Sequence, residues 1–162
     1  MKVTRAASIP LVTHDPYFSI WSGADHLYDK DPVHWSQIRQ QLRGYVNVDG
    51  VVYSFLGDKE FHETIGQTGV DVTATSTTYT FENEKIILNV KFTSPLLLDD
   101  LTLVSRPCTY IDYAVEKKEN HAFIGYVGLH DITFDVDFSP AVEIGWRLIP
   151  EVWNQGLSLI HI

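Results

Sequence analysis

The sequence predicts an all-β protein, an antiparallel β-sandwich that forms a single domain. Three observations carry this prediction. Apolar residues recur with a period of two along most of the chain, rather than with the 3.6-residue period of a helix. The alternating runs follow one another at intervals of roughly ten to fifteen residues, which is the spacing of sandwiches. With 162 residues, the chain is also long enough to bury roughly 70% of the surface that its unfolded form exposes.

The first element with a clear local mechanism is a hairpin in YVNVDGVVYSFLG, residues 45–57. Asp49 and Gly50 both tolerate positive φ, as a two-residue type I′ turn requires, and β-forming runs flank them. Pairing outward from this turn assigns each residue a partner and a face. One face then holds the pairs Val48–Val51, Val46–Tyr53 and Gly44–Phe55, and the other holds Tyr45–Ser54 and Asn47–Val52.

The later runs have the same alternation. A second hairpin is predicted in TTYTFENEKIILNVKFT, with a polar turn at 82–85, and single strands are predicted at 109–115, 131–139 and 142–148. In each run one face is apolar, as expected for an antiparallel sheet with one dry face. The apolar sets are Tyr79, Phe81, Ile86, Leu88, Val90 and Phe92; Thr109, Ile111, Tyr113 and Val115; Ile132, Phe134, Val136 and Phe138; and Val142, Ile144, Trp146 and Leu148.

A helix is possible only at 34–43, where Trp35, Ile38 and Leu42 fall at helical spacing. The run is short and has no strong cap. An irregular connection therefore fits this segment equally well.

The alternation of apolar residues along the chain predicts how the chain is divided into domains. We expect residues 1–121 to form the N-terminal β-sandwich domain and residues 122–156 to continue its strands. The end of the chain, NQGLSLIHI, is apolar and has no turn or cap, so residues 157–162 are predicted to be a non-native tail. The chain is therefore expected to be a fragment of a larger protein.

The composition excludes several classes of protein. The formal net charge is −9 and the longest basic run is Lys117-Lys118, whereas nucleic-acid partners require a basic stripe. Cys108 is the only cysteine, so no intramolecular disulfide and no thiolate zinc site can form. The first residues lack the apolar stretch of a secretory signal, and no segment is long enough to span a membrane. We therefore expect no nucleic-acid partner, no membrane partner, and a soluble, unexported chain.

The motif PLVTHDPYFSIWS, residues 10–22, resembles the N-terminal region of the glutaminase A family. The resemblance covers roughly residues 9 to 121, and its motifs are specific only in conjunction. The further motifs are HW at 34–35, LRGYVNVDGVVYSFLG at 42–57, QTGVDVTATSTTYTFE at 67–82 and KFTSPLLLDDLTLVSRPCTYIDY at 91–113.

This resemblance implies a β-sandwich domain that precedes an α-helical toroid. In the family, the toroid belongs to the part taken to hydrolyse the side-chain amide of glutamine to glutamate and ammonia, and this chain contains no such helical region. The implied partner is therefore the missing C-terminal helical domain of the same polypeptide. A small-molecule substrate would be reached only through the full-length protein. Many family members are exported, so the compartment stays open.

The stretch 15–35, DPYFSIWSGADHLYDKDPVHW, concentrates acidic, histidine and aromatic residues. Its oxygen and imidazole groups could hold a divalent ion. The offsets of an EF-hand are missing, however, which favours a solvated acidic loop without a metal. The residues concerned are Asp25, His26, Asp29, Asp31 and His34.

Asp15 has two interpretations. Paired with Asp25, it could supply the acid and base of amide or glycoside hydrolysis. Asp15 followed by Pro16 is also a common turn start, in which the carboxylate accepts backbone N–H bonds. The sequence favours the turn.

The aromatic residues of this stretch also have two interpretations. Tyr17, Trp21, Tyr28 and Trp35 could form a stacking platform for a sugar or another ligand. Alternatively, Trp21 and Trp35 pack against the missing helical domain, which the family resemblance favours. We therefore interpret 15–35 as an interdomain segment that reaches the substrate cleft. Its candidate residues are Asp15, Trp21, His34 and Trp35.

Arg106, in the SRP motif at 105–107, is the last candidate for this interdomain or substrate-cleft site. An arginine fork matches a substrate carboxylate, but the sequence favours a structural salt bridge with Asp99 or Asp100.

No catalytic motif of the G-x-S-x-G or H-E-x-x-H type is present. We assign no catalytic residue, no metal and no cofactor, and we expect the chain alone to be inactive. Two other functions stay open, a carbohydrate- or ligand-binding module and an accessory domain of a glycoside hydrolase.

Overall fold

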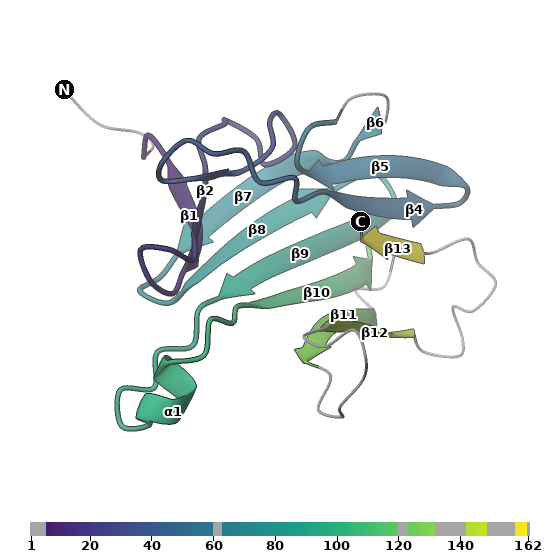
Figure 1. Cartoon of the computed structure of the whole chain (residues 1–162). Helices are drawn as coiled ribbons and strands as arrows, with labels where there is room; N and C mark the ends of the chain where they lie inside the picture. The colour runs from purple at the N-terminus through teal and green to yellow at the C-terminus, as the bar shows by residue number, and fades with distance from the viewer. Residues whose placement is uncertain (1–5, 60–62, 120–122, 132–141, 149–157, 162) are drawn as a thin grey trace.

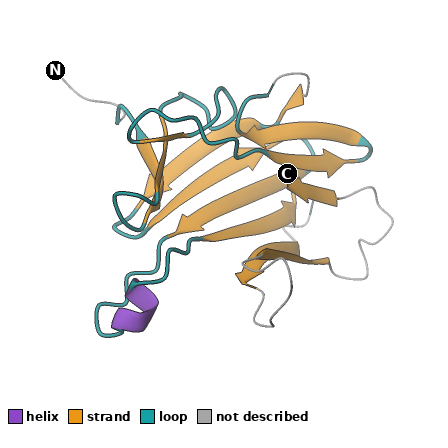
Figure 2. Ribbon diagram, in the orientation of Figure 1, coloured by secondary structure: helices purple, strands orange, loops and turns teal. Residues whose placement is uncertain are grey.

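The computed structural model describes residues 6–59, 63–119, 123–131, 142–148 and 158–161. Within these residues, thirteen strands form three sheets, and the single helix, α1 (Leu101–Val104), has four residues (Figure 2). The predicted all-β, sandwich-like class is therefore confirmed. No helix in the described part of the chain is long and apolar enough to cross a membrane.

The larger layer is a six-stranded antiparallel sheet in which strands that follow one another in the chain are neighbours. The hairpin formed by residues 76–93 pairs Phe81 with Leu88 and Tyr79 with Val90, which confirms the second predicted hairpin. The strands are β7 (Gly66–Val72), β8 (Ser76–Glu82), β9 (Ile86–Thr93), β10 (Tyr110–Lys117), β11 (Phe123–Asp131) and β12 (Val142–Leu148).

The predicted single strands map onto this sheet. The strand predicted at 109–115 is β10, and the one predicted at 142–148 is β12. Of the strand predicted at 131–139, only Asp131 is described, as the last residue of β11, so the rest of that prediction lies outside the described residues.

The second layer is a four-stranded sheet that lies over one face of the first (Figure 1). Its strands are β4 (Gly44–Val48), β5 (Val51–Leu56), β6 (Glu63–Thr64) and β13 (Ser158–His161), in the order β13-β4-β5-β6. The short pairing of β5 with β6 is the parallel exception in this sandwich.

The core lies between these two layers. Phe55 of β5 is fully buried, with its ring centroid 5.9 Å from that of Phe81 and 5.7 Å from that of Tyr113. Full burial of one such aromatic side chain contributes up to about 3 kcal/mol. Burial also raises the pKa of the Tyr113 hydroxyl. The apolar faces predicted from alternation after residue 75 supply half of this core, namely Tyr79, Phe81, Ile86, Leu88, Val90, Phe92, Ile111, Tyr113 and Val115.

The turn between β4 and β5 has the predicted geometry, because Asp49 and Gly50 have φ values of 54° and 85°. Four pairs match the prediction, Val48–Val51, Asn47–Val52, Val46–Tyr53 and Tyr45–Ser54. The prediction is wrong at Gly44, which pairs with Leu56 instead of Phe55, because a bulge adds one residue to β5. The Phe55 ring packs directly on Gly44, where any Cβ would overlap it.

A third, small sheet covers the end of the six-stranded sheet at which β7 turns into β8 (Figure 1). Its strands are β1 (Ile9–Thr13), β2 (Ser19–Ser22) and β3 (Val33–His34). Two hydrogen bonds attach β1 to the larger layer. The Thr77 hydroxyl donates to the Pro10 carbonyl at 2.7 Å, and the Thr13 N–H donates to the Ser94 hydroxyl at 3.1 Å.

The segment 34–43 is an irregular connection rather than a helix. Gln37 has a φ of 70°, and Val33 forms an isolated antiparallel bridge with Arg39. A positive φ at a non-glycine residue interrupts helical geometry, so the apolar spacing in this segment does not define a helix face.

Gly50→Val should destabilise the protein by about 1 kcal/mol or more, because a β-branched residue resists positive φ. A Cβ at this position meets no atom within 4 Å, so the cost comes from the backbone alone. Chemical denaturation measures it. The matched control is Gly69→Val on β7, where a Cβ would make an ordinary contact 3.8 Å from Thr80. Equal stabilities of the two variants would contradict the turn assignment.

Candidate functional site

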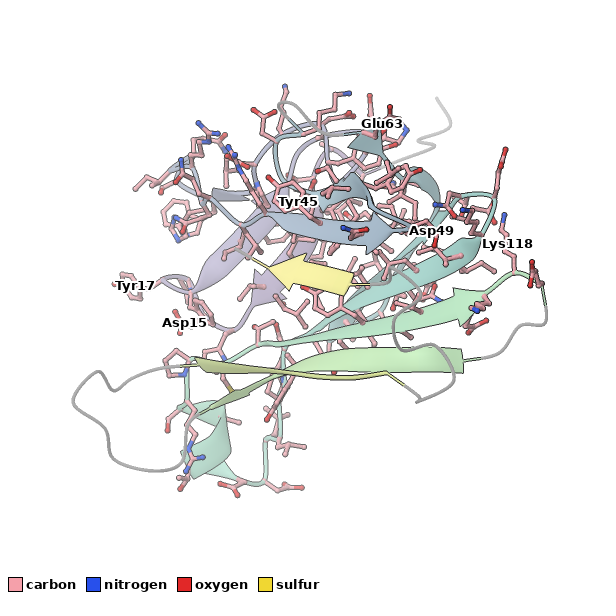
Figure 3. All side chains as sticks on the ribbon, turned by 90° about the vertical axis from the view of Figure 1, so that its right-hand side faces the viewer. Asp15, Tyr17, Tyr45, Asp49, Glu63 and Lys118 are labelled. Carbon is pink, nitrogen blue, oxygen red and sulfur yellow. The ribbon has the colours of Figure 1, made fainter. Side chains whose placement is uncertain are left out.

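The opening stretch folds around a turn capped by Asp15. The Asp15 Oδ1 accepts the backbone N–H groups of Tyr17 at 2.7 Å and Phe18 at 2.9 Å, as the turn interpretation predicted. These two bonds hold the pKa of Asp15 below its usual value. The turn leaves the Tyr17 side chain 94% exposed, and Figure 3 shows it pointing away from the sandwich.

The carbonyl of Pro16, inside this turn, joins it to the segment after β3. It accepts the Trp35 Nε1–H at 2.5 Å and lies 3.0 Å from the His34 Nε2. The Ser36 N–H donates to the other ring nitrogen of His34, so Nε2 carries the hydrogen that Pro16 accepts. The structure therefore brings Asp15, His34 and Trp35 together in one hydrogen-bonded unit.

Three large apolar side chains of these two loops face solvent. Tyr17 is 94%, Trp35 61% and Ile38 63% exposed. Tyr17 and Asp15 lie on the opposite side of the molecule from Asp49 and Lys118 (Figure 3). We refer to Tyr17, Trp35 and Ile38 as the aromatic surface.

Residues 94–109 leave the sandwich between β9 and β10, and α1 stands clear of both layers (Figure 1). The Asp100 Oδ1 accepts the Thr102 N–H at 3.0 Å at the start of α1. We call this excursion the leucine loop because it exposes four leucines to solvent: Leu96, Leu97, Leu98 and Leu101.

The two remaining candidates lie apart from the Pro16 unit. Arg106 is exposed and directly follows α1 in the leucine loop. Trp21 is half-buried on β2, and its Nε1–H donates to the Ser19 hydroxyl at 2.6 Å. The five candidates therefore do not form one cluster.

Asp31 corrects the interpretation of the acidic loop as solvated. Its carboxylate is only 1% exposed, and it accepts bonds from the Arg39 Nε at 2.5 Å, the Arg43 Nε at 3.4 Å and the Asp58 N–H at 2.8 Å. Burial alone would raise the pKa of Asp31, but these three donors outweigh it and hold the pKa below the usual value. The sequence shows that residue 31 is acidic, but it does not reveal the partners of this carboxylate, which lie 8 to 27 residues away.

The other members of that loop also have partners. Asp29 accepts the His26 backbone N–H at 3.0 Å, and its second oxygen lies 3.6 Å from the Lys59 Nζ. Across the described ranges, no group of three or more His, Cys, Asp or Glu side chains is arranged to hold a metal ion.

His14 is a residue that the sequence reasoning did not single out. Its side chain is 4% exposed, and its Nε2 lies 3.9 Å from the Asp15 Oδ2. Its Nδ1 is buried without a hydrogen-bond partner among the described residues. The sequence indicated a turn that starts at Asp15, but it gave no sign that the neighbouring His14 ring is buried. That burial depends on tertiary packing.

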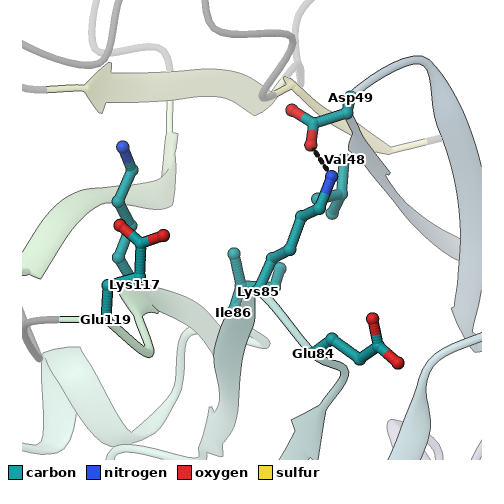
Figure 4. A pocket seen from close by; sticks show the side chains of 7 residues that line it. All are labelled: Val48, Asp49, Glu84, Lys85, Ile86, Lys117 and Glu119. Atoms are coloured by element: carbon teal, nitrogen blue, oxygen red, sulfur yellow. Dashed lines mark hydrogen bonds and ion pairs between the residues drawn. The ribbon is translucent and has the colours of Figure 1, made fainter.

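A hollow of about 270 Å³ opens at the β4–β5 turn (Figure 4). Its lining is Val48, Asp49, Glu84, Lys85, Ile86, Lys117 and Glu119. Lys85 forms an ion pair with Asp49 across it, and this bond raises the pKa of Lys85. The pair joins two hairpin turns, which is a structural use of these charges.

The sequence of this chain matches two protein families. Residues 2–65 match a family described as a domain of unknown function (DUF4964), and residues 75–133 match another domain of unknown function (DUF5127). No solved structure matches the chain.

The class of protein that the fold defines is an all-β, sandwich-like domain. Within this class, the chain is similar to the N-terminal part of glutaminase A from Aspergillus oryzae, with 29% identity over 162 residues. The match covers 95% of this chain and 22% of the relative, so the chain spans about a fifth of the length of the curated relative it matches. The predicted resemblance to the glutaminase A family is confirmed.

Asp31→Asn should lower the free energy of unfolding by about 3 kcal/mol, because it leaves two guanidinium groups without their shared carboxylate. The stabilisation by Asp31 is fully present above the unfolded carboxyl pKa of about 3.9 and is lost as the pH falls through the lower folded pKa. Denaturation between neutral and acidic pH measures both effects. Asp71→Asn, at an exposed position on β7, is the control. An Asp31→Asn protein with the stability and acid sensitivity of that control would contradict the assignment.

Proposed function

We propose that this chain is the N-terminal, non-catalytic β domain of a glutaminase A-like amidohydrolase. The whole protein would hydrolyse glutamine to glutamate and ammonia. The observation that carries the proposal is the similarity to a glutaminase A along 95% of this chain but only 22% of the relative. Most of the machinery of such a protein would then lie outside the residues that this chain supplies.

The hydrogen bonds of Asp15 and Asp31 support a non-catalytic role for these two carboxylates. Hydrolysis of an amide needs a nucleophile or activated water, a proton donor for the leaving ammonia and stabilisation of the oxyanion. The Asp31 carboxylate accepts hydrogen bonds from Arg39 and from the Asp58 N–H. One oxygen of Asp15 accepts two backbone N–H groups of its own turn. Both carboxylates act as structural anchors.

The aromatic surface and the leucine loop support a docking role. Solvent-exposed apolar side chains of this size are typical of interfaces. Leu98 and Leu101 are each 79% exposed on an excursion that the sandwich itself does not use for its core. We propose that both features contact the remainder of the same polypeptide, which the family resemblance predicts to be helical. Asp15, His34 and Arg106 would then border the interdomain cleft.

The chain of 162 residues should bind a hydrophobic dye or self-associate at micromolar concentration, because its docking surface is uncovered. Replacing Leu98 and Leu101 by Ser should reduce dye fluorescence and association without altering the fold. Val70→Ser, at an exposed apolar position on β7, is the matched control. A monomer that binds no dye would show that the exposed leucines are not a docking surface.

The isolated chain should release no ammonia from glutamine, whereas a longer polypeptide that contains it should do so. Ammonia release by purified protein is the measurement. A His34→Gln, Trp35→Phe double variant, which alters the Pro16 unit, serves as the control for contaminating activity. Turnover by the isolated chain that survives repurification and disappears in the double variant would overturn the non-catalytic assignment. A longer polypeptide without activity would overturn the glutaminase assignment.

A further inference from the structure

A second hollow, of about 320 Å³, is lined by residues of β1, β2 and the turn that joins β7 to β8. These elements lie at one end of the sandwich (Figure 1). Small-molecule sites typically have volumes of about 300–1,000 Å³. Its lining is Pro10, Leu11, Thr13, Trp21, Thr73, Ala74, Thr75, Ser76, Thr77, Ser94 and Leu96.

The chemistry of this lining is unusual for the chain. None of the lining residues is charged, although the chain has a formal net charge of −9. Six of them carry a hydroxyl group: Thr13, Thr73, Thr75, Ser76, Thr77 and Ser94. Each hydroxyl can both donate and accept a hydrogen bond. Trp21 adds the only aromatic ring of the lining.

Hydrogen bonds fix the walls of the hollow. The Trp21 Nε1–H donates to the Ser19 hydroxyl at 2.6 Å, which satisfies its one polar group and holds the ring in place. The Ser94 N–H donates to the Thr75 carbonyl at 2.9 Å, and the Thr77 hydroxyl donates to Pro10. These bonds join β1, the β7–β8 turn and the start of the leucine loop. The hollow is therefore preformed.

The Thr73 and Ser76 hydroxyls bond to each other at 2.8 Å, and the Ser94 hydroxyl accepts the Thr13 N–H. Within the described part of the chain, the hydroxyls of Thr13 and Thr75 take no part in these bonds. Thr75 is exposed and Thr13 is half-buried. They are placed in the same hollow as the Trp21 ring, which offers a flat apolar face.

We infer that this hollow binds a neutral, polyhydroxylated ring, that is, a sugar. The apolar face of a sugar ring stacks on Trp21, and its hydroxyls exchange hydrogen bonds with Thr13 and Thr75. An amino acid such as glutamine does not fit this chemistry, because its carboxylate and ammonium groups require charged partners that the lining lacks. A purely apolar ligand would leave the hydroxyls of Thr13 and Thr75 without partners.

The test is a calorimetric titration of the 162-residue chain with glucose, galactose and maltose as neutral probes, and with glucuronate and glutamine as charged probes. At least one neutral sugar should bind saturably with a Kd on the order of 1 mM, while the charged probes do not. Trp21→Ala should weaken this binding by about tenfold or more through loss of stacking. Thr75→Val should weaken it about fivefold through loss of one hydrogen bond.

Trp35→Ala is the matched control, since it removes a tryptophan of the aromatic surface outside this hollow and should leave sugar binding unchanged. Circular dichroism checks the fold of each variant. If Trp21→Ala does not fold, Thr75→Val decides alone, because the Thr75 side chain is exposed. The inference is overturned if no neutral sugar saturates the chain, if glutamine binds equally well, or if the folded variants at Trp21 and Thr75 bind like the parent.

Discussion

The arrangement of the segment around the Pro16 unit depends on one buried carboxylate. Asp31 accepts hydrogen bonds from Arg39 and Arg43 and from the Asp58 N–H, so it ties the long connection before β4 to the end of β5. Gly57 makes this approach possible, because a Cβ there would lie 2.5 Å from the Leu42 carbonyl and 2.9 Å from Asp31. With Asp31 fixed, the adjoining β3 can pair with β2. The Pro16 unit rests on that pairing, which gives an irregular segment a defined surface.

Features set by neighbours in the chain could be predicted from the sequence, and features set by distant partners could not. The turn at Asp49-Gly50 follows from the φ values that two adjacent residues tolerate, so its register is correct out to Tyr45. The error at Gly44 arises because the Phe55 ring occupies the space above it, which alternation does not encode. For the site, the capping of its turn by Asp15 was predictable because it spans three residues. The burial of Asp31 depends on partners from two other places in the chain, Arg39 and Arg43 before β4 and Asp58 after β5.

The polar and apolar groups of the surface are divided between regions with different chemistry. The hollow at the β4–β5 turn has paired charges, whereas the hollow at Trp21 has hydroxyls and no charge. The leucine loop and the aromatic surface expose apolar groups. An acidic chain repels an anionic ligand at long range, so selectivity for a neutral ligand is consistent with both the lining and the net charge. Leu96 belongs to both the leucine loop and the Trp21 hollow, so the proposed docking surface and the proposed ligand site adjoin each other.

The two matched families divide the chain along its layers rather than into separately packed units. Residues 2–65 contain β1 to β6, and residues 75–133 contain β8 to β11. Phe55 from the first range and Phe81 from the second are both fully buried, and they are in contact with each other. Either range alone would expose a row of large apolar side chains to solvent. The free-energy cost of this exposure is roughly 25 cal/mol for each Å² of apolar surface. The two ranges therefore share one core. The hollow at Trp21 draws residues from both ranges, so it forms only when both ranges are present.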